Sequence, residues 1–383
     1  MKRKRILIIG IDGYLGFPLA LRCLHNTHVV HGIDNFSRRA AVEEQGSISA
    51  TDILKPMDRI SDMGMISNFT FHRKDIIKDR DFVSKLIQKH KFHTIVNLAH
   101  NPSAPYSMKD SDTSRRVLEN NVIGTNNLLW DIKEYSPDSH YITIGSTGEY
   151  DHTIGVDIEE GYFQFEHKGM KSKECLFPRQ GNSVYHCSKI ASTYLIDYLT
   201  RLWNLKCTDV MQSIVYGLYT PEMVKYRQVN RCDTDDCFGT VINRFVVQAM
   251  LGEPLTVFGH GKHQRAFLSL SDSIQALEIA INNEPEPGVV QSWNQLSEWH
   301  SIERVADMVK DAIEGTTTTS IKSPRKEFTG GHHYNFETTK LKDLGYVPTR
   351  TIKEEIDYMI KAIRMTPIKR EKLLSVIQPK VNF

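Results

Sequence analysis

Tyr185 and Lys189 stand four residues apart in a stretch with a helical pattern, so their side chains share one face of a helix. A free tyrosine hydroxyl has a pKa of about 10, too high for a base at neutral pH. A nearby ammonium, and a positively charged cofactor ring, would favour the phenolate and lower that pKa. Ser146 follows a short apolar run and could hydrogen-bond the hydroxyl that Tyr185 deprotonates. Thr147 is a rival for that role, and an ordinary turn serine is the simpler alternative.

Three glycines, Gly10, Gly13 and Gly16, have the spacing G-x-x-G-x-x-G between an apolar run and a helical pattern. Such glycines let the backbone turn tightly and approach a pyrophosphate, which binds to the exposed amides at a helix N-terminus. Asp34 ends the next apolar run, near the offset of about 20 residues expected for a carboxylate that binds adenosine ribose hydroxyls. A carboxylate there repels a 2′-phosphate, so the pattern predicts NAD rather than NADP.

Other side chains near these glycines complete the predicted cofactor site. Arg38 and Arg39 would favour NADP if they faced the ribose, but solvated positions beside it are the simpler alternative. Asp75 with Ile76 fits an adenine contact, or an ordinary turn. The predicted cofactor-binding residues are Gly10, Gly13, Tyr14, Leu15, Gly16, Asp34, Asn35, Arg38, Asp75, Ile76, Leu98, Ala99, Tyr185 and Lys189.

The elements that must position these residues alternate along the first half of the chain. Strands are predicted at residues 5–9, 29–33, 69–72, 94–98, 141–144 and 207–214. Helices are predicted between them at 14–24, 82–90, 114–134 and 183–203. Buried strands that alternate with helices indicate an α/β fold with a doubly wound parallel sheet of the Rossmann type.

After Gly217 the regular alternation of strands and helices ends, and residues 224–236 are polar and irregular. A short strand is expected at 255–258, and helices are expected at 238–251, 301–314 and 351–364. We expect a smaller, interleaved substrate-binding domain over the carboxyl edge of the sheet, where ligands bind in such folds. The predicted division is 1–215 for the NAD-binding domain, 216–365 mainly for the substrate domain, and 366–383 for a loosely docked tail.

The composition excludes several other classes of protein. A net charge of +2 provides no global field for nucleic acid or an anionic membrane. No apolar stretch approaches the roughly 20 residues of a membrane span, and no signal peptide is visible. The six cysteines are scattered without a C-x-x-C pair, which predicts a cytoplasmic protein without disulfides or structural zinc. The pair His332-His333 is more simply a surface or core pair than a metal site, so no metal is predicted.

Several longer motifs are specific enough to indicate a family. Over about residues 5–365 the chain resembles the UDP-sulfoquinovose synthases, which belong to the extended short-chain dehydrogenase/reductases. The matching pieces are SAPYSM at 103–108, Gly148-Glu149-Tyr150, Tyr185-His186 before Ser188-Lys189, the segment 230–259, His333-Tyr334-Asn335 and Thr339-Lys340-Leu341. The resemblance implies tightly bound NAD, UDP-glucose as substrate, oxidation at C4, loss of water across C5–C6, and addition of sulfite to the resulting enone.

The chain departs from the family pattern at its reaction pocket. The family's Glu-Gln-Arg is His100-Asn101-Pro102 here, its Thr-Met-Gly-Glu-Tyr-Gly is 146–151 (STGEYD), and its Gln-Thr-Arg-Gly is 263–266 (HQRA). Arginine is a natural partner for a sulfite anion, and proline cannot replace it. We therefore expect the same early steps but poor sulfite addition. A 4-epimerase or a 5,6-dehydratase on the same scaffold is the alternative.

The resemblance also implies roles for individual residues. Plain 4,6-dehydratases carry Asp-Glu where this chain has Thr147-Gly148, which weighs against that reaction. Glu149 could act as acid or base at C5 or C6, with a turn carboxylate as the simpler alternative. Arg265 matches the arginine that extended reductases place on the nucleotide pyrophosphate, and Asn243 and Arg244 are weaker candidates. The predicted catalytic residues are Ser146, Glu149, Tyr185 and Lys189, and the predicted substrate-binding residues are Ser146, Thr147, Gln212, Asn243, Arg244 and Arg265.

Two further expectations concern partners. Helices 114–134 and 183–203 carry apolar residues beyond one face, and the resemblance places them in a four-helix interface, which predicts a homodimer. A remote alternative is a non-catalytic NAD- or RNA-binding protein. Such relatives usually lose the Tyr/Lys pair, which is intact here, and no basic and aromatic platform is evident.

Overall fold

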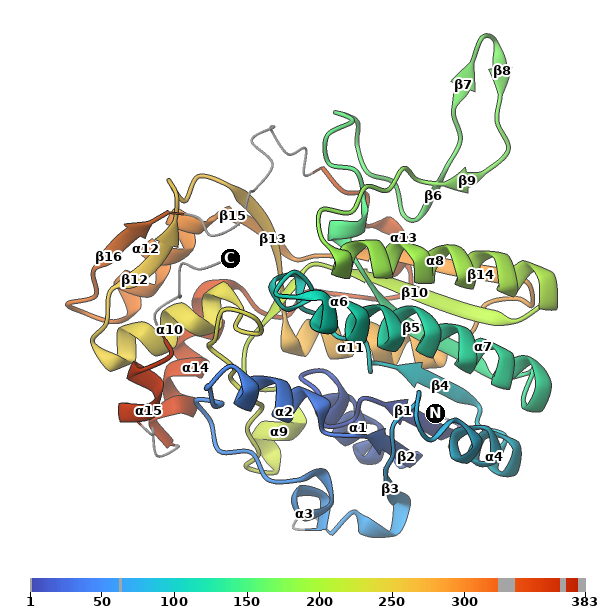
Figure 1. Cartoon of the computed structure of the whole chain (residues 1–383), viewed down its shortest axis with the longest axis horizontal. Coiled ribbons are helices and arrows are strands. Elements are labelled where there is room, and N and C mark those ends of the chain that lie inside the picture. The colour runs from blue at the N-terminus through green and yellow to red at the C-terminus, as the bar shows by residue number, and fades with distance from the viewer. Residues whose placement is uncertain (1, 62–63, 323–334, 366–369, 378–383) are drawn as a thin grey trace.

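The computed structural model describes residues 2–61, 64–322, 335–365 and 370–377. A parallel sheet runs through the centre, in the strand order β14-β10-β5-β4-β1-β2-β3 (Figure 1). Its strands are β1 (Arg5–Ile9), β2 (Val29–Asp34), β3 (Phe69–Arg73), β4 (Thr94–Asn97), β5 (His140–Ser146), β10 (Lys206–Gln212) and β14 (Val289–Gln295). The chain winds outward in both directions from the adjacent strands β1 and β4, which confirms the predicted doubly wound fold.

Helices cover both faces of this sheet, so the inner strands are apolar on both sides. In β1, Ile6 and Ile8 pack in one buried cluster with α1 and α11, whereas Leu7 and Ile9 pack in another with α4, α7 and α8. These helices are α1 (Gly16–His25) and α11 (Leu270–Asn282) on the first face, and α4 (Arg80–His90), α7 (Gly124–Tyr135) and α8 (Val184–Trp203) on the second. The carboxyl ends of the strands stay open to ligands.

Strand β14 extends this sheet and helix α11 packs on it, although both follow residue 215, the predicted end of the NAD-binding domain. The sequence of β14, VVQSWNQ, lacks the β-branched run of the inner strands because it lies at an edge and pairs only with β10. The boundary at residue 215 and the interleaving of the two domains stay predictions.

A second, smaller core packs beside the carboxyl edge of the sheet. It is built from α10 (Val241–Leu251), α12 (Ile302–Ala312), α14 (Ile352–Met365), α15 (Arg370–Leu374), β11 (Ile214–Tyr216), β12 (Leu255–Phe258), β13 (Gln264–Ser269), β15 (Glu298–Ser301) and β16 (Thr318–Ile321). Leu373 and Ile377 are fully buried in this core. The described part of the tail is therefore docked, contrary to the loose attachment expected from the sequence.

The predicted helix 114–134 is divided into α6 (Ser111–Leu118), a π-helical turn at Glu119–Ile123, and α7. The turn brings the fully buried Asn121 to α8, where its Nδ2 donates to Ser188 Oγ at 2.9 Å. Asn120 donates to the carbonyl oxygen of Ala99. Such turns recur at functional sites, and this one ties the helix to the segment after β4 that lines the site described below.

Shorter elements complete the chain. A hairpin arm stands away from the body in Figure 1 and contains β6 (Tyr162–Phe163), β7 (Glu166–His167), β8 (Met170–Lys171) and β9 (Cys175–Leu176). The remaining elements are α2 (Ser37–Glu44), α3 (Pro56–Ser61), Ile66–Asn68, α5 (Ala104–Ser107), Thr147–Glu149, α9 (Pro221–Lys225) and α13 (Thr339–Asp343). Within the described ranges, no helix combines the length and the apolar character needed to cross a bilayer.

Candidate active site

A cavity of about 1760 Å³ opens at the carboxyl ends of the central strands. Ligand pockets usually measure about 300–1,000 Å³, so this one has room for more than one ligand. Gly10 and Asp34 line it from the glycine-rich side, Tyr185 from α8 and Arg265 from the second core. The lining contains every predicted cofactor-binding residue except Gly16, together with the predicted substrate-binding residues.

The glycine-rich turn leaves no space for side chains at two of its positions. Gly10 has a φ of +85°, and a Cβ there would lie 2.6 Å from the carbonyl carbon of Leu98. At Gly16 a Cβ would collide with the carbonyl oxygen of Gly10. Helix α1 begins at Gly16, so its free amides face the turn. A cradle of bare backbone at a helix N-terminus fits the pyrophosphate of a dinucleotide.

The predicted ribose carboxylate lies at the end of β2. Asp34 accepts hydrogen bonds from the amides of Asp12 at 2.8 Å and Phe36 at 2.7 Å. Burial, together with the charge of Asp12, raises the pKa of Asp34 to about 6. Next to it, Asn35 Nδ2 donates to Asp75 Oδ2 at 2.8 Å, which joins two other predicted cofactor residues at the same wall.

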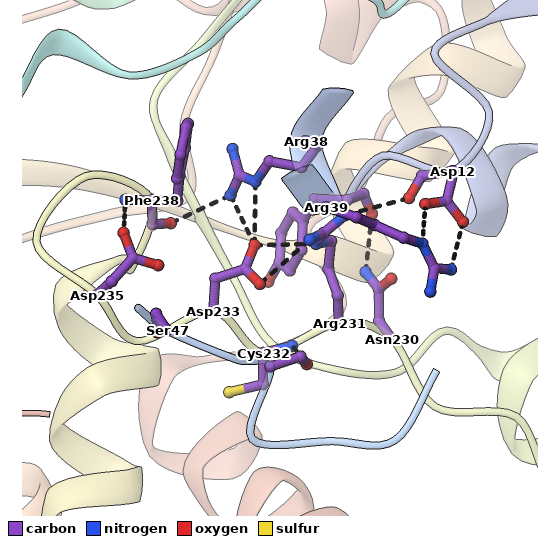
Figure 2. A network of polar contacts seen from close by, with 12 residues as sticks. Asp12, Arg38, Arg39, Ser47, Asn230, Arg231, Cys232, Asp233, Asp235 and Phe238 are labelled. Atoms are coloured by element: carbon purple, nitrogen blue, oxygen red, sulfur yellow. Dashed lines mark hydrogen bonds and ion pairs between the residues drawn. The ribbon is translucent and has the colours of Figure 1, made fainter. Parts of the chain in front are cut away.

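Figure 2 shows how the two arginines after Asp34 are neutralised. Arg39 forms a bidentate pair with Asp12, at 2.6 and 2.7 Å. Arg38 donates to Asp233 at 3.0 and 2.8 Å and lies 3.9 Å above the Phe238 ring. Because each guanidinium already faces a carboxylate, the arrangement fits NAD better than NADP.

The partner of Arg38 comes from the loop 229–239, which sequence reasoning did not connect to the cofactor site. Asp233 also pairs with Arg231 at 2.9 Å, and Asn230 Nδ2 donates to the carbonyl oxygen of Tyr14 at 2.7 Å (Figure 2). The loop therefore binds both the glycine-rich turn and the segment after β2. The available signal was the charge-rich motif NRCDTDD, whose partners lie some 195 positions earlier in the chain.

Tyr185 and Lys189 share one face of α8, as their spacing predicted, and both line the cavity. Ser146, at the end of β5, lines the same cavity as Tyr185. Burial and then the charge of Glu149 raise the pKa of Tyr185, and the nearby Ser146 hydroxyl opposes this rise. Burial lowers the pKa of Lys189 to about 8. The chain alone thus holds Tyr185 as a neutral phenol, so the lowering expected from the sequence is not produced by its residues.

Glu149 is fully buried behind Ser146. Its Oε1 accepts from the Ser146 amide at 2.8 Å, and its Oε2 pairs with Arg179 at 2.6 Å and accepts from Thr193 at 3.0 Å. A carboxylate held in this way fixes the turn after β5. The geometry favours the structural alternative over the predicted acid–base role at the sugar.

The predicted substrate residues all line the cavity, but their side chains differ in what they contact. The amide of Gln212 is bonded to Ser273 at 2.9 Å and Gln295 at 2.6 Å. Asn243 Oδ1 accepts from the Gly217 amide at 3.2 Å, and Arg244 donates to the Thr256 carbonyl at 3.1 Å. These three side chains hold the wall in place, and Arg265, on β13, donates to the carbonyl oxygen of Gln264 at 2.9 Å.

The residues that the structure describes contain no group of three or more His, Cys, Asp or Glu side chains suited to a metal ion. The pair His332-His333 lies outside the described residues.

Comparison with known proteins shows the family to which the chain belongs. The sequence profile of the NAD dependent epimerase/dehydratase family matches residues 6–291. The chain is 38% identical to the UDP-sulfoquinovose synthase of Sulfolobus acidocaldarius, over 99% of this chain and 97% of that protein. It is 37% identical to the chloroplastic UDP-sulfoquinovose synthase of Spinacia oleracea, over 90% of this chain and 72% of that protein.

Solved structures share the fold at lower identity. A Bacillus cereus UDP-glucuronic acid 4-epimerase, in complex with UDP-glucuronic acid and NAD, has a TM-score of 0.70 at 22% identity and covers 94% of this chain and 99% of its own. A Thermotoga maritima UDP-glucose 4-epimerase with UDP-glucose has a TM-score of 0.72 at 19% identity, with the same coverage. The chain is an NAD-dependent enzyme of the NAD dependent epimerase/dehydratase family, in the group that contains the UDP-sulfoquinovose synthases.

Proposed function

We propose that this enzyme transiently oxidises C4 of a nucleotide-activated hexose, most simply a UDP-hexose, as a functional relative of UDP-sulfoquinovose synthase. The observation that carries the proposal is the shared cavity, in which Tyr185 and Ser146 face the same space as the glycine-rich turn and Asp34. Similarity to UDP-sulfoquinovose synthases along almost the whole chain supports the substrate class.

The residues of the chain divide the chemistry between them. Tyr185 takes the proton of the C4 hydroxyl, and Ser146 hydrogen-bonds the same oxygen as it becomes a ketone. Bound NAD supplies the hydride acceptor and can return the hydride later. Because the chain's own residues leave Tyr185 neutral, the positively charged ring of bound NAD would have to act together with Lys189 to favour the phenolate. The C4 ketone makes the C5 proton acidic, which opens elimination or epimerisation without net redox change.

Replacement of the base tests this assignment. Tyr185→Phe removes one oxygen and little volume, so NAD and nucleotide-sugar binding should persist. Turnover should fall by at least about 10²–10⁴-fold, the range usual for loss of a general base. The control is Tyr358→Phe, an exposed tyrosine on α14 outside the cavity, which should keep wild-type turnover. Full activity in Tyr185→Phe would refute the mechanism.

The outcome after C4 oxidation separates the remaining alternatives. A C4 epimer as the product would identify a 4-epimerase, and an unsaturated sugar would identify a 5,6-dehydratase. Product analysis by mass spectrometry and NMR, with and without sulfite, distinguishes these from a sulfonate product.

We also infer a homodimer in a reducing compartment. Large apolar side chains are exposed on α6, on the π-helical turn, on α7 and on α8. They are Leu118, Ile123, Trp130, Tyr194, Tyr198 and Leu202. A second copy is the partner that the family resemblance favours for this face, and light scattering that finds a monomer at micromolar concentration would contradict it. All six cysteines are described and are free thiols, which supports a cytoplasmic setting.

A further inference from the structure

Lys189 makes a contact that the proposed chemistry does not use. Its Nζ donates a hydrogen bond to Nδ1 of His100 at 2.6 Å and another to the carbonyl oxygen of Ile144. Both side chains are nearly buried, with exposures of 4% for Lys189 and 9% for His100. The ammonium is therefore held by fixed protein acceptors. The sequence had suggested only that His100 alters the reaction pocket.

The contacts of the two ring nitrogens determine the tautomer of His100. Nδ1 must be unprotonated to accept from an ammonium, so the ring proton is on Nε2. Nε2 lies 2.8 Å from Thr125 Oγ1 on α7, which can accept that proton's hydrogen bond, whereas Asn97 Nδ2, at the longer distance of 3.4 Å, offers no acceptor. Burial and the positive charge of Lys189 lower the pKa of His100 well below its usual value. The imidazole thus stays neutral and remains an acceptor.

The other charged groups near the ammonium come from different elements. Glu149, in the turn after β5, and Asp209, on β10, both act to raise the pKa of Lys189, against the larger effect of burial. Asp209 is itself buried, and its pKa is raised to about 7 by burial and by Glu149. Tyr185 faces the same space from α8, and Tyr141 lies beyond His100, bonded to Asn97 at 3.0 Å. The effect of burial outweighs that of the two carboxylates, so Lys189 loses its proton more readily than a solvated lysine does.

We propose that His100 is a positioning residue whose neutral imidazole keeps Lys189 protonated and fixed in place, so that Tyr185 faces a positive charge throughout turnover. A hydrogen bond to the charged form of a group favours that form. A leucine at position 100 removes the acceptor and lets the buried amine lose its proton at lower pH. A glutamine retains an acceptor oxygen, whereas a glutamate adds a charge that holds the proton more strongly.

The test titrates Lys189 directly and compares it with turnover. Protein with ¹³Cε-labelled lysine, still carrying its cofactor, is titrated by NMR, and the Lys189 signal is assigned with Lys189→Met. In His100→Leu we expect the Lys189 midpoint to fall by about one to two pH units, the size expected for one lost hydrogen bond to a charged group. His100→Gln should stay within about half a unit of wild type, on the same scale, and His100→Glu should move upward. The alkaline limb of the pH–rate profile should move in the same order.

Thr125→Val provides a second variant that leaves His100 and Lys189 in place. It removes the acceptor of the Nε2 proton, so the imidazole is held less firmly against Lys189, and the Lys189 midpoint should fall by less than in His100→Leu. Unchanged midpoints in both His100→Leu and Thr125→Val would overturn the proposal, as would equal shifts in His100→Leu and His100→Gln. The inference rests on Tyr185 as the base. An active Tyr185→Phe would refute the proposed function, whereas an inactive one with unmoved titrations would refute only the role of His100.

Discussion

Asp233 lies between Arg38 and Arg231, and its Oδ2 contacts both guanidinium groups, at 2.8 and 2.9 Å (Figure 2). This one carboxylate joins the loop 229–239 to the segment that follows the ribose carboxylate. From these ion pairs of Asp233 we predict how strongly the protein binds its cofactor and whether it prefers NAD or NADP.

Asp233→Asn should weaken cofactor binding and reduce stability. The change leaves Arg38 and Arg231 without their shared countercharge, and loss of one partner from a buried ion pair costs about 3–5 kcal/mol. We expect a lower unfolding midpoint, less copurified NAD, and a higher affinity for NADP relative to NAD, because Arg38 can then face a 2′-phosphate. Denaturant unfolding and chromatography of the released dinucleotide measure these effects.

The matched control for this variant is Asp307→Asn, which breaks the exposed Lys310–Asp307 pair at 2.7 Å. Exposed pairs contribute about 0–1 kcal/mol, so this variant should behave like wild type. Equal stability and NAD content in the two variants would show that the Asp233 network does not retain the cofactor.

Wild-type protein should copurify with NAD rather than NADP. Asp34 lines the cavity at the predicted ribose position, and both following arginines are paired with carboxylates. Denaturation of the pure protein and identification of the released dinucleotide provides the measurement. NADP as the main species would overturn the interpretation of Asp34.

Gly16→Ala should lose most of its bound NAD. A Cβ at Gly16 meets the backbone at Gly10 and Ile11, which cannot move aside without opening the turn. Overpacking of this kind costs about 1–3 kcal/mol. Gly315→Ala is the comparison, because Gly315 does not line the cavity and a Cβ there meets nothing within 4 Å, although its φ of +78° adds backbone strain. Equal NAD content in the two variants would contradict the predicted difference.

The sequence predicted these local features because they depend on neighbouring residues. The glycine spacing, the helix with Tyr185 and Lys189, and the apolar inner strands are all visible in short windows. The pairs that depend on distant segments were not predictable. The residues next to Asp233 in the sequence do not indicate that it pairs with Arg38. Likewise, those next to Glu149 do not indicate that its Oε2 pairs with Arg179. Strand β14 escaped prediction since an edge strand needs no apolar run.

Acid should destabilise the fold through the buried His31. Its ring is stacked against His72, with a centroid distance of 5.5 Å, and lies 4.4 Å from His90. Burial and these neighbours lower the pKa of His31 to about 4, below the value of about 6.5 in an unfolded chain. The unfolded state therefore binds the proton more readily. Stability from this group is complete above pH 6.5 and declines as the pH falls from about 6.5 towards 4.

His31→Phe keeps an aromatic ring in this cluster and removes the titration. Urea unfolding at pH 7.5 and pH 5 should show a smaller loss of stability for the variant than for wild type. An identical loss in both proteins would mean that other groups control the acid sensitivity.

The reaction itself provides the last prediction. If C4 is oxidised, wild-type enzyme with UDP-glucose in deuterated water should exchange the C5 proton, because the transient ketone acidifies that carbon. The position where the family carries an arginine is Pro102, which lines the cavity and has no cationic group to hold sulfite. Sulfite should therefore add poorly or not at all, although C5 exchange proceeds.

Pro102→Arg is the variant that checks this reasoning, because it restores a guanidinium at that position without touching Tyr185 or Lys189. It should increase sulfonate formation from UDP-glucose and sulfite relative to wild type, with C5 exchange unchanged. Efficient sulfonate formation by the wild-type enzyme would show that another group binds sulfite. Absence of both C5 exchange and a C4 epimer, in a protein that retains NAD, would mean that the substrate is a different nucleotide sugar, since the base, the cofactor site and the cavity remain in place.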